Sequence, residues 1–273
     1  MSGLKDLRGK VAVVTGGTSG IGKGIAKQLI AEGMRVVIAS KRNDALQATA
    51  AEIGAVGIQT DVSDLASVQA LARAVCERFG TVHVLCNNAG VGPLGRIADL
   101  SINDWKWVLG TNLWGCIHGV NVFLPLLRAN PDGGHIVNTS SLGGLMTMPE
   151  AGAYHVSKFG MTALSETLAQ ELAQEGSKVG VTLLCPGPVH SDIHSSSRNR
   201  PDSLQGGGLA DVDLKTLPVA AHSRWLEPEE VGRMTVEAIK NGDLYVITHP
   251  EAFDEIDSRH QAIARAFHRK PER

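Results

Sequence analysis

The strongest constraint on the fold is the alternation of short apolar runs with longer helical patterns along the chain. Several of the short runs are too apolar to face water, which is typical of strands buried on both faces of a parallel sheet. Seven runs are expected to be strands, at residues 10–15, 35–40, 57–60, 82–86, 135–140, 179–185 and 244–248. Helical patterns lie between them, at residues 22–32, 44–52, 65–79, 102–127, 154–174 and 228–241. This order predicts an α/β fold, a doubly wound sheet of seven parallel strands with helices on both faces.

The length of the chain fits a single α/β domain over residues 1–273. Residues 192–226 interrupt the alternation with weak periodicity and a run of three glycines. A segment of this kind is expected to be either disordered or a lid over a substrate site. Residues 254–273 predict a C-terminal helix that packs on its own domain or on another subunit, because three apolar residues recur there at near-helical spacing: Ile256, Ile263 and Phe267.

Composition and charge exclude several classes of protein. Hydrophobic residues make up 43% of the chain and charged residues 20%, which excludes a disordered chain. Lys and Arg number 26 against 28 for Asp and Glu, so a nucleic-acid partner is not expected. Residues 1–10 are charged and contain no uninterrupted apolar run of the kind found in a signal peptide, and no later window is both long and free of charge. We therefore expect a cytoplasmic protein without a membrane segment.

The cysteines and histidines do not have the spacing of metal ligands. The four cysteines contain no CxxC pair and lie in apolar segments, so we expect buried, reduced thiols: Cys76, Cys86, Cys116 and Cys185. Four histidines near candidate site residues lack a helix-compatible ligand spacing with an acidic partner: His155, His190, His194 and His222. We therefore expect no metal site.

A glycine-rich turn follows the first expected strand directly. Gly16, Gly20 and Gly22 occur in the run TGGTSGIG, after which an amphipathic helix begins. Glycines let the backbone approach a pyrophosphate, and the free N–H groups of the helix start stabilise its charge. An ordinary strand-to-helix turn is the alternative interpretation. A nucleoside-triphosphate loop is disfavoured because Lys23 is followed by Gly24, where a magnesium-binding hydroxyl is needed.

Further motifs follow this turn in a fixed order. Asn-Asn-Ala-Gly at 87–90 comes after the fourth expected strand, Tyr154 and Lys158 form a YxxxK pattern, and Pro-Gly-Pro-Val at 186–189 follows the sixth strand. Together with Asn112 and Ser141, these motifs resemble the short-chain dehydrogenase/reductase family in its classical form. The resemblance implies a single Rossmann-type domain that binds NAD(P)(H) and transfers hydride between an alcohol and a carbonyl, with a secondary alcohol and a ketone or aldehyde as the reacting pair.

Tyr154 is the candidate general acid and base. Hydride transfer to a carbonyl requires a proton for the new alkoxide, and the reverse reaction requires a base for the alcohol. Tyrosine suits both directions if a nearby positive charge lowers its pKa from about 10. Lys158 lies one helical turn later on the same face and is expected to supply that charge. A lone YxxxK pattern could equally be an ordinary helix surface.

Ser141 and Asn112 complete the candidate catalytic set. Ser141 follows the fifth strand, where its hydroxyl could donate to the substrate oxygen, while the neighbouring Ser140 is assigned to structure. By the family resemblance, Asn112 would hold a water that links Lys158 to solvent; a buried structural role is the alternative. A non-catalytic dinucleotide-binding sensor or regulator is the rival function, but it has no chemical need for all four residues.

The end of the second strand bears on the choice of nicotinamide cofactor. An acidic residue there would bind the adenosine ribose of NAD and repel the extra phosphate of NADP. Ser40 stands at this position, followed by Lys41 and Arg42, so NADP(H) is favoured and NAD(H) is possible. A solvated charged turn is the alternative interpretation.

The remaining cofactor contacts are expected by resemblance. Asp61 could contact the adenine or cap the following helix. The other expected contacts lie in the glycine-rich turn and after later strands, with Tyr154 and Lys158 also on the cofactor: Thr18, Ser19, Ile21, Val62, Asn88, Ala89, Gly90, Pro186, Gly187, Val189 and Ser191.

The substrate is predicted only by class. Apolar residues follow Ser141 and occupy the long insert, which favours an alicyclic, aromatic or steroid-like molecule, although lid packing would explain them equally: Leu142, Met146, Met148, Pro188 and Trp225. The family resemblance also implies a homotetramer or homodimer built on the helices that contain Asn112 and Tyr154.

Overall fold

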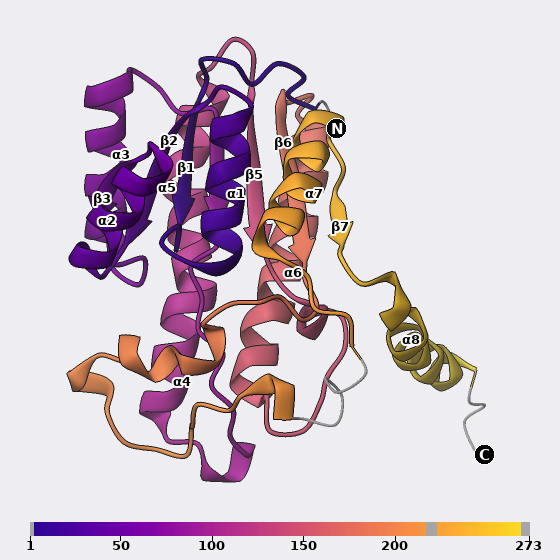
Figure 1. The fold of residues 1–273 in the computed structure, drawn as a ribbon. Helices are drawn as coiled ribbons and strands as arrows, with labels where there is room; N and C mark the ends of the chain where they lie inside the picture. Colours follow the sequence, from indigo (N-terminus) through magenta and orange to yellow (C-terminus); the bar gives the residue numbers. More distant parts are fainter. Residues whose placement is uncertain (1–2, 217–222, 269–273) are drawn as a thin grey trace.

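Seven parallel strands form one sheet in the computed structural model, in the order β3-β2-β1-β4-β5-β6-β7 (Figure 1). The strands are β1 (Val11–Thr15), β2 (Arg35–Ser40), β3 (Val56–Gln59), β4 (Val84–Asn87), β5 (Gly134–Thr139), β6 (Val179–Cys185) and β7 (Tyr245–Ile247). The structure describes residues 3–216 and 223–268. The predicted seven-stranded parallel sheet is confirmed, and the strand order reverses between β1 and β4, where such folds bind their ligands.

Helices cover both faces of the sheet. One face carries α1 (Gly20–Ala31), α2 (Asn43–Ile53) and α7 (Pro228–Asn241), and the other carries α3 (Leu65–Phe79), α5 (Gly115–Arg128) and α6 (Gly152–Gln174). Successive residues of β1 serve the two cores alternately: Ala12 and Val14 pack with the first group, Val11 and Val13 with the second. All five residues of β1 are buried, as the sequence predicted for a strand covered on both faces.

The helix predicted at residues 102–127 is interrupted. The structure has α4 (Ile102–Leu109), one π-helical turn, η2 (Gly110–Trp114), and then α5. Asn112 lies in the π turn, where both ends of its side-chain amide bond the backbone of Val91. The predicted long helical segment is confirmed, and the π turn within it was not predicted. Apolar periodicity locates a helix but does not specify a single wider turn inside it.

The insert at 192–226 is ordered over its described residues. It forms three short 3₁₀ helices, η4 (Ile193–Asn199), η5 (Asp202–Leu204) and η6 (Leu214–Thr216), drawn in orange beside α4 in Figure 1. Leu204 and Leu209 pack against a small core around Trp107. Residues 192–216 and 223–226 thus have defined backbone positions, and the role of the insert as a lid stays a prediction. Residues 217–222, which include His222, lie outside the described residues.

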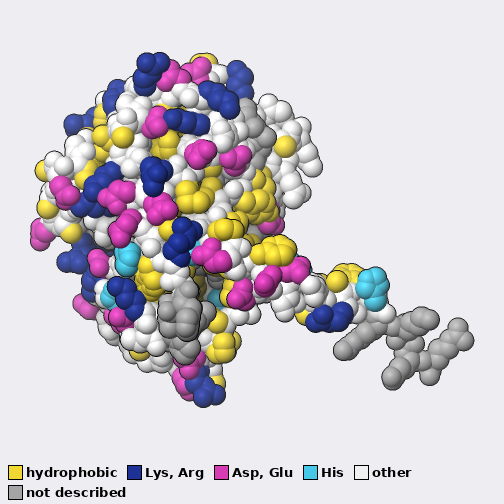
Figure 2. All heavy atoms as spheres, turned by 45° about the vertical axis from the view of Figure 1, so that its right-hand side comes forward, with side chains coloured by type: hydrophobic (Ala, Val, Ile, Leu, Met, Phe, Trp, Pro, Cys, Tyr) yellow, Lys and Arg dark blue, Asp and Glu magenta, His cyan; other side chains and the backbone are white. Residues whose placement is uncertain are grey.

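The C-terminal helix α8 (Phe253–Phe267) stands away from the body of the molecule (Figures 1 and 2). Every residue of α8 is at least partly exposed, and Phe253 and Phe267 are 66% and 83% exposed. Its contact with the rest of the domain includes Arg259, whose guanidinium lies 4.9 Å from the Phe159 ring centroid. The predicted helix is present, but it packs on its own domain only along one edge.

Three negative findings concern the described residues. None of their helices is long and apolar enough to cross a membrane. Their His, Cys, Asp and Glu side chains form no group of three that could hold a metal ion. All four cysteines are unpaired, and burial raises the pKa of Cys86, Cys116 and Cys185 to about 12, which keeps these thiols protonated.

Candidate active site

A cleft of about 360 Å³ opens at the carboxyl ends of the strands, beside β1 and β4, where the strand order reverses. The β1–α1 turn forms one wall. Gly16 has a φ of 65°, and a Cβ there would lie 2.8 Å from the Cα of Ala89. The N-cap Ser19 makes no side-chain capping bond, so the backbone N–H groups of the first turn of α1 are open to an anion. These features fit the pyrophosphate of a dinucleotide.

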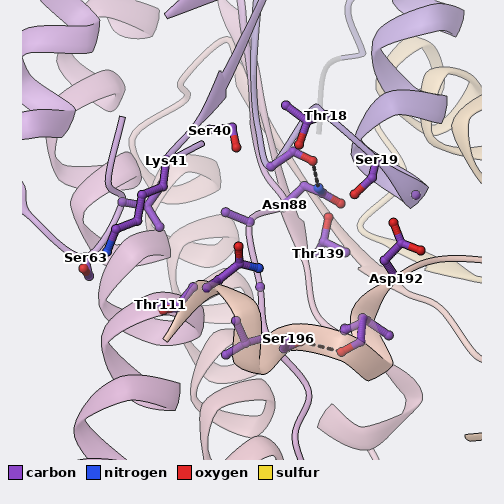
Figure 3. A pocket seen from close by; sticks show the side chains of 18 of the residues that line it. Thr18, Ser19, Ser40, Lys41, Ser63, Asn88, Thr111, Thr139, Asp192 and Ser196 are labelled. Carbon is purple, nitrogen blue, oxygen red and sulfur yellow. Dashed lines mark hydrogen bonds between the residues drawn. The ribbon is translucent and has the colours of Figure 1, made fainter. Parts of the chain in front are cut away.

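Thr15 and Asn88 join this turn to the loop after β4. The Thr15 hydroxyl accepts hydrogen bonds from the backbone N–H groups of Asn88 and Ala89, at 3.0 and 3.1 Å. The Asn88 side chain donates to the carbonyl of Thr15 at 3.1 Å. The loop after β4 is thereby held against the glycine turn, and Figure 3 shows Asn88 at the centre of the cleft between the two walls.

Ser40 and Lys41, labelled in Figure 3, line the far end of the cleft with Arg42. Lys41 Nζ lies 2.8 Å from an Asp61 carboxylate oxygen. Partial burial raises the pKa of Asp61, but hydrogen bonds from Lys41 and Ser63 outweigh it, so the net shift is downward and Asp61 is ionised. Within the described residues Arg42 has no ion-pair partner. This end of the cleft therefore carries Lys41, which is in an ion pair, and Arg42, which is not.

Tyr154 and Lys158 lie at the opposite end, on the first turns of α6. Lys158 is 3% exposed, donates from Nζ to the Thr139 carbonyl at 2.8 Å, and lies 5.5 Å from the centroid of the Tyr154 ring. Burial raises the pKa of Tyr154, and a hydrogen bond with Ser141 offsets only part of that rise. The sequence predicted a lowered pKa. In the structure the direction is the opposite, because desolvation of the buried hydroxyl outweighs the favourable interaction with Ser141.

The two serines after β5 have different partners. Ser140 reaches the cleft wall, but its hydroxyl is buried and donates to the carbonyl of Lys158 at 3.1 Å, which is a structural role. Ser141 lies outside the wall, accepts the N–H of Gly143 at 3.0 Å, donates to the Pro186 carbonyl at 3.4 Å and interacts with Tyr154; its catalytic role stays a prediction. Ser141 therefore lies beside the hydroxyl of the candidate acid.

Asn112 is tied to the backbone rather than open to the cleft. Its Oδ1 accepts from Val91 N at 2.8 Å, and its Nδ2 donates to Val91 O at 2.9 Å and to the Ser157 hydroxyl at 3.1 Å. These bonds satisfy the buried amide and hold the loop after β4 against α6. The structure shows this structural role directly; the water-holding role stays a prediction.

Burial gives Lys158 a pH signature. Desolvation lowers its pKa from 10.5 to about 8, so between these values the unfolded chain binds a proton that the native protein does not. The free energy of unfolding, measured relative to a Lys158→Met variant, should therefore rise as pH increases from about 8 toward 10.5. Urea denaturation at several pH values measures this difference, and a difference that stays constant with pH would contradict it.

The structure brings most of the predicted cofactor residues to the cleft wall and leaves a few in the packing. Gly22, Gly187 and Val189 lie outside the wall. A Cβ at Gly22 would collide with the Gly16 carbonyl oxygen, Gly187 packs on His249, and Val189 belongs to the core. The predicted substrate residues also lie beside the wall rather than on it: Leu142, Met146, Met148, Pro188 and Trp225.

Several wall residues were not predicted. They come from the π turn, from α4 and from η4, and include Lys106, Trp107, Thr111, Ile193, Ser196 and Arg198. The Ser196 hydroxyl accepts the N–H of Gly92 at 3.1 Å, which holds η4 over the cleft, and Figure 3 shows Ser196 and Asp192 on this side. No local motif marks these positions, because they reach the cleft only through the tertiary arrangement of α4, the π turn and the insert.

Comparison with known proteins identifies the family. The model of the short chain dehydrogenase family matches residues 10–202. The C alpha-dehydrogenase of a Sphingobium species is 34% identical over 267 residues, covering 95% of this chain and 87% of that protein. Glucose 1-dehydrogenase 2 of Bacillus subtilis is 31% identical over 242 residues, covering 85% of this chain and 92% of that protein.

A solved structure agrees with these relatives in fold and in sequence. The crystal structure of a short chain dehydrogenase/reductase from Burkholderia phymatum in complex with NAD has a TM-score of 0.87 and 39% identity, covering 98% of both chains. The family match spans the glycine turn, Asn112, Ser141, Tyr154 and Lys158. On the fold, the cleft and these similarities together, the chain belongs to the short-chain dehydrogenase family.

Proposed function

We propose that this oxidoreductase interconverts a secondary alcohol and a ketone, or an aldehyde and its primary alcohol, with Tyr154 as general acid and base. The observation that carries the proposal is the grouping of Tyr154 and Lys158 on the wall of a cleft whose other end fits a dinucleotide, with Ser141 next to Tyr154. A bound nicotinamide supplies or accepts the hydride. The family and its dehydrogenase relatives favour this reaction over a non-catalytic sensor.

The side chains divide the proton chemistry between them. In reduction, the Tyr154 hydroxyl donates its proton to the carbonyl oxygen as negative charge develops there, and in oxidation the same oxygen accepts the proton of the alcohol. The Lys158 ammonium stabilises the resulting phenolate electrostatically. Ser141 accepts the Gly143 N–H, and its own proton, which in the structure is donated to the Pro186 carbonyl over a long 3.4 Å, can turn to the substrate oxygen.

NADP(H) is the cofactor that we propose is preferred. Ser40 supplies a hydroxyl where an acid would repel a 2′-phosphate, and the unpaired Arg42 and the paired Lys41 stand beside it. NAD(H) is the competing choice, since the related Burkholderia phymatum enzyme was crystallised with NAD. Fluorescence titration of the purified protein with NADPH and NADH separates the two, and tighter NADH binding would overturn the preference.

Ser40→Asp should reverse this cofactor preference. The new carboxylate would lie beside the phosphate position and repel it, while it could accept hydrogen bonds from the unphosphorylated ribose. We expect the ratio of NADPH to NADH affinity to fall by at least about tenfold, which corresponds to about 1.4 kcal/mol. Ser40→Asn, which has a similar size and no charge, is the matched control. An unchanged ratio in Ser40→Asp would contradict the assigned position.

The substrate that we propose is apolar, of alicyclic, aromatic or steroid-like shape. The supporting observation is the apolar character of the wall near Tyr154, which Val91, Pro186, Ile193 and Leu204 help to form. Reduction assays with cyclohexanone, acetophenone and benzaldehyde test the class. Turnover confined to charged or sugar carbonyls would reject it.

We propose a cytoplasmic homodimer or homotetramer for the assembled enzyme. Support comes from α5 and α6, where Trp114, the residue that precedes α5, is 53% exposed and Val156 of α6 is 48% exposed. Large apolar side chains exposed on adjacent helices are typical of an interface between subunits.

A further inference from the structure

His155, the residue after Tyr154, is a buried group that the proposed reaction does not yet use. It is 7% exposed, and its ring nitrogens contact two backbone groups of the segment after β5. Nδ1 lies 2.7 Å from the Gly143 carbonyl oxygen, and Nε2 lies 2.9 Å from the Met148 nitrogen. A carbonyl only accepts and a backbone N–H only donates, so the proton of the neutral ring is on Nδ1.

The bond to Gly143 connects His155 to Ser141. Gly143 receives the Nδ1–H of His155 on its carbonyl, while its own N–H donates to the Ser141 hydroxyl at 3.0 Å. Ser141 in turn lies close enough to Tyr154 to counteract part of the rise that burial causes in its pKa. One peptide unit on each side of Gly143 therefore links a buried imidazole to the hydroxyl beside the candidate acid.

Close packing also restricts the position of Gly143. A Cβ at Gly143 would lie 3.1 Å from His155 Nδ1 and 3.2 Å from Tyr154 Cε1, so the glycine lies close against both rings. The distant end of the segment is held separately, because the Glu150 carbonyl accepts the N–H of Gly95 at 2.6 Å. His155 thus holds the part of the segment nearest to Tyr154.

We propose that His155 is a positioning residue that orients the Ser141 hydroxyl against Tyr154 through the Gly143 peptide. This inference rests on the proposed function of Tyr154 and Ser141. Loss of the bond to Gly143 lets the Ser141 hydroxyl move, and small displacements of reacting groups reduce turnover strongly. The bond from the Met148 N–H holds the backbone at Met148 and does not reach Ser141, so we expect its loss to reduce turnover less.

Three substitutions separate the two bonds. His155→Asn keeps a donor at the Nδ1 position for Gly143 and loses the acceptor for Met148. His155→Gln keeps an acceptor for Met148 and loses the donor, and His155→Leu loses both. We expect kcat to fall about tenfold in the Leu and Gln variants with the NADPH dissociation constant within about twofold, and to stay within about threefold in the Asn variant.

The kinetic test is a double-mutant cycle with Ser141→Ala, using whichever of the three carbonyls the enzyme reduces. If His155 acts through Ser141, adding His155→Leu to Ser141→Ala lowers kcat little further. Additive losses would overturn the proposal. His135→Leu is the matched control: His135 is also buried, bonded to Thr182 at 2.8 Å near the start of β5, and should lower stability without changing kcat.

A titration without substrate keeps this inference separate from the proposed function. The chain has two tyrosines, so in a Tyr245→Phe background the ultraviolet absorbance of tyrosinate reports Tyr154 alone. The groups that influence it are Ser141, Lys158 of α6 and Cys185 of β6. His155→Leu should raise the titration midpoint as Ser141→Ala does, because both remove the bond that favours the phenolate. Identical midpoints in the parent and His155→Leu would overturn the positioning role, even if none of the carbonyls is reduced.

Discussion

Tyr154→Phe should lower kcat by about 10²–10⁴-fold, because it removes the group that exchanges a proton with the substrate oxygen. The ring and its packing against Gly143 are retained, so the cleft keeps its shape. The glycine turn and the rim at Ser40 lie at the other end of the cleft and are unaffected. The NADPH dissociation constant, measured by fluorescence titration, should therefore stay within about twofold of the parent value while turnover is lost.

Tyr245→Phe is the matched control for this substitution. Tyr245 is the other tyrosine of the chain, is 46% exposed, and donates to Glu166 at 2.8 Å away from the cleft. Its loss should leave kcat within about twofold, since exposed polar contacts contribute little. If Tyr154→Phe retained more than about a tenth of the parent kcat, Tyr154 would not be the acid, and a water or Ser141 would have to supply the proton.

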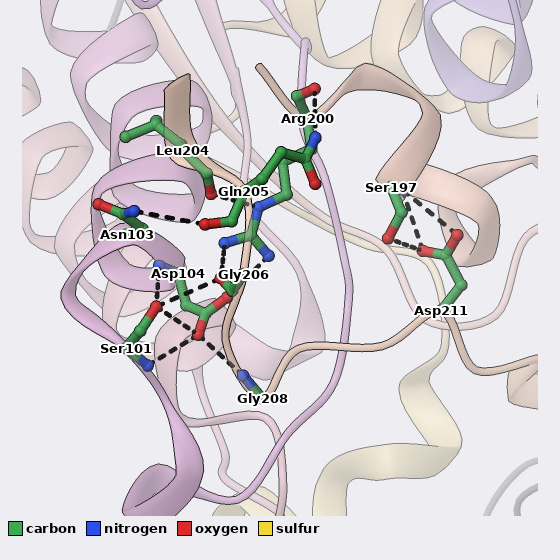
Figure 4. Close-up of polar contacts among 10 residues, drawn as sticks. All are labelled: Ser101, Asn103, Asp104, Ser197, Arg200, Leu204, Gln205, Gly206, Gly208 and Asp211. Carbon is green, nitrogen blue, oxygen red and sulfur yellow. Dashed lines mark hydrogen bonds and ion pairs between the residues drawn. The ribbon is translucent and has the colours of Figure 1, made fainter. Parts of the chain in front are cut away.

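Arg200→Met should destabilise the native protein by about 3–5 kcal/mol, because it leaves a buried carboxylate without its cation. Arg200 Nη1 lies 2.8 Å from Asp104 Oδ1, and the two side chains are 7% and 0% exposed. The guanidinium also donates to the carbonyls of Leu204 and Gly206 (Figure 4). It lies 5.0 Å from the Trp107 ring centroid. Urea denaturation measures the loss.

The same cluster fastens the insert to α4. Asp104 also accepts hydrogen bonds from the N–H and hydroxyl of Ser101 and from the N–H of Gly208, so both ends of the 200–208 turn meet at one carboxylate (Figure 4). Loss of Arg200 should therefore also increase proteolysis within residues 192–216. Arg128→Met is the control: its ion pair with Glu175 is about half exposed, and removal should cost less than about 1 kcal/mol. Equal decreases in the free energy of unfolding for the two variants would contradict the larger contribution expected of the buried ion pair.

Local patterns in the sequence were sufficient for the sheet and for much of the cleft. Burial on both faces leaves an apolar run wherever a central strand occurs, which is why the five inner strands could be located from apolar runs. The edge strands β3 and β7 are only partly buried and were located by their place in the alternation with helices. The turn at Gly16 and the one-turn spacing of Tyr154 and Lys158 are also local, because each depends on backbone geometry over a few residues. These features carried the prediction of the family, which the comparisons confirm.

Tertiary structure alone decided the polar partners. The π turn at Asn112 depends on the backbone of Val91, the insert is held by Asp104 on α4, and Lys41 is paired with Asp61 across two strands. The upward shift in the pKa of Tyr154 depends on how deeply the fold encloses its hydroxyl. The sequence by itself determined which segments are buried and which turns bind an anion, since apolar periodicity and glycine positions are local properties. Which charges meet, and which hydroxyl is desolvated, depends on contacts between distant segments, and no single stretch of sequence encodes those.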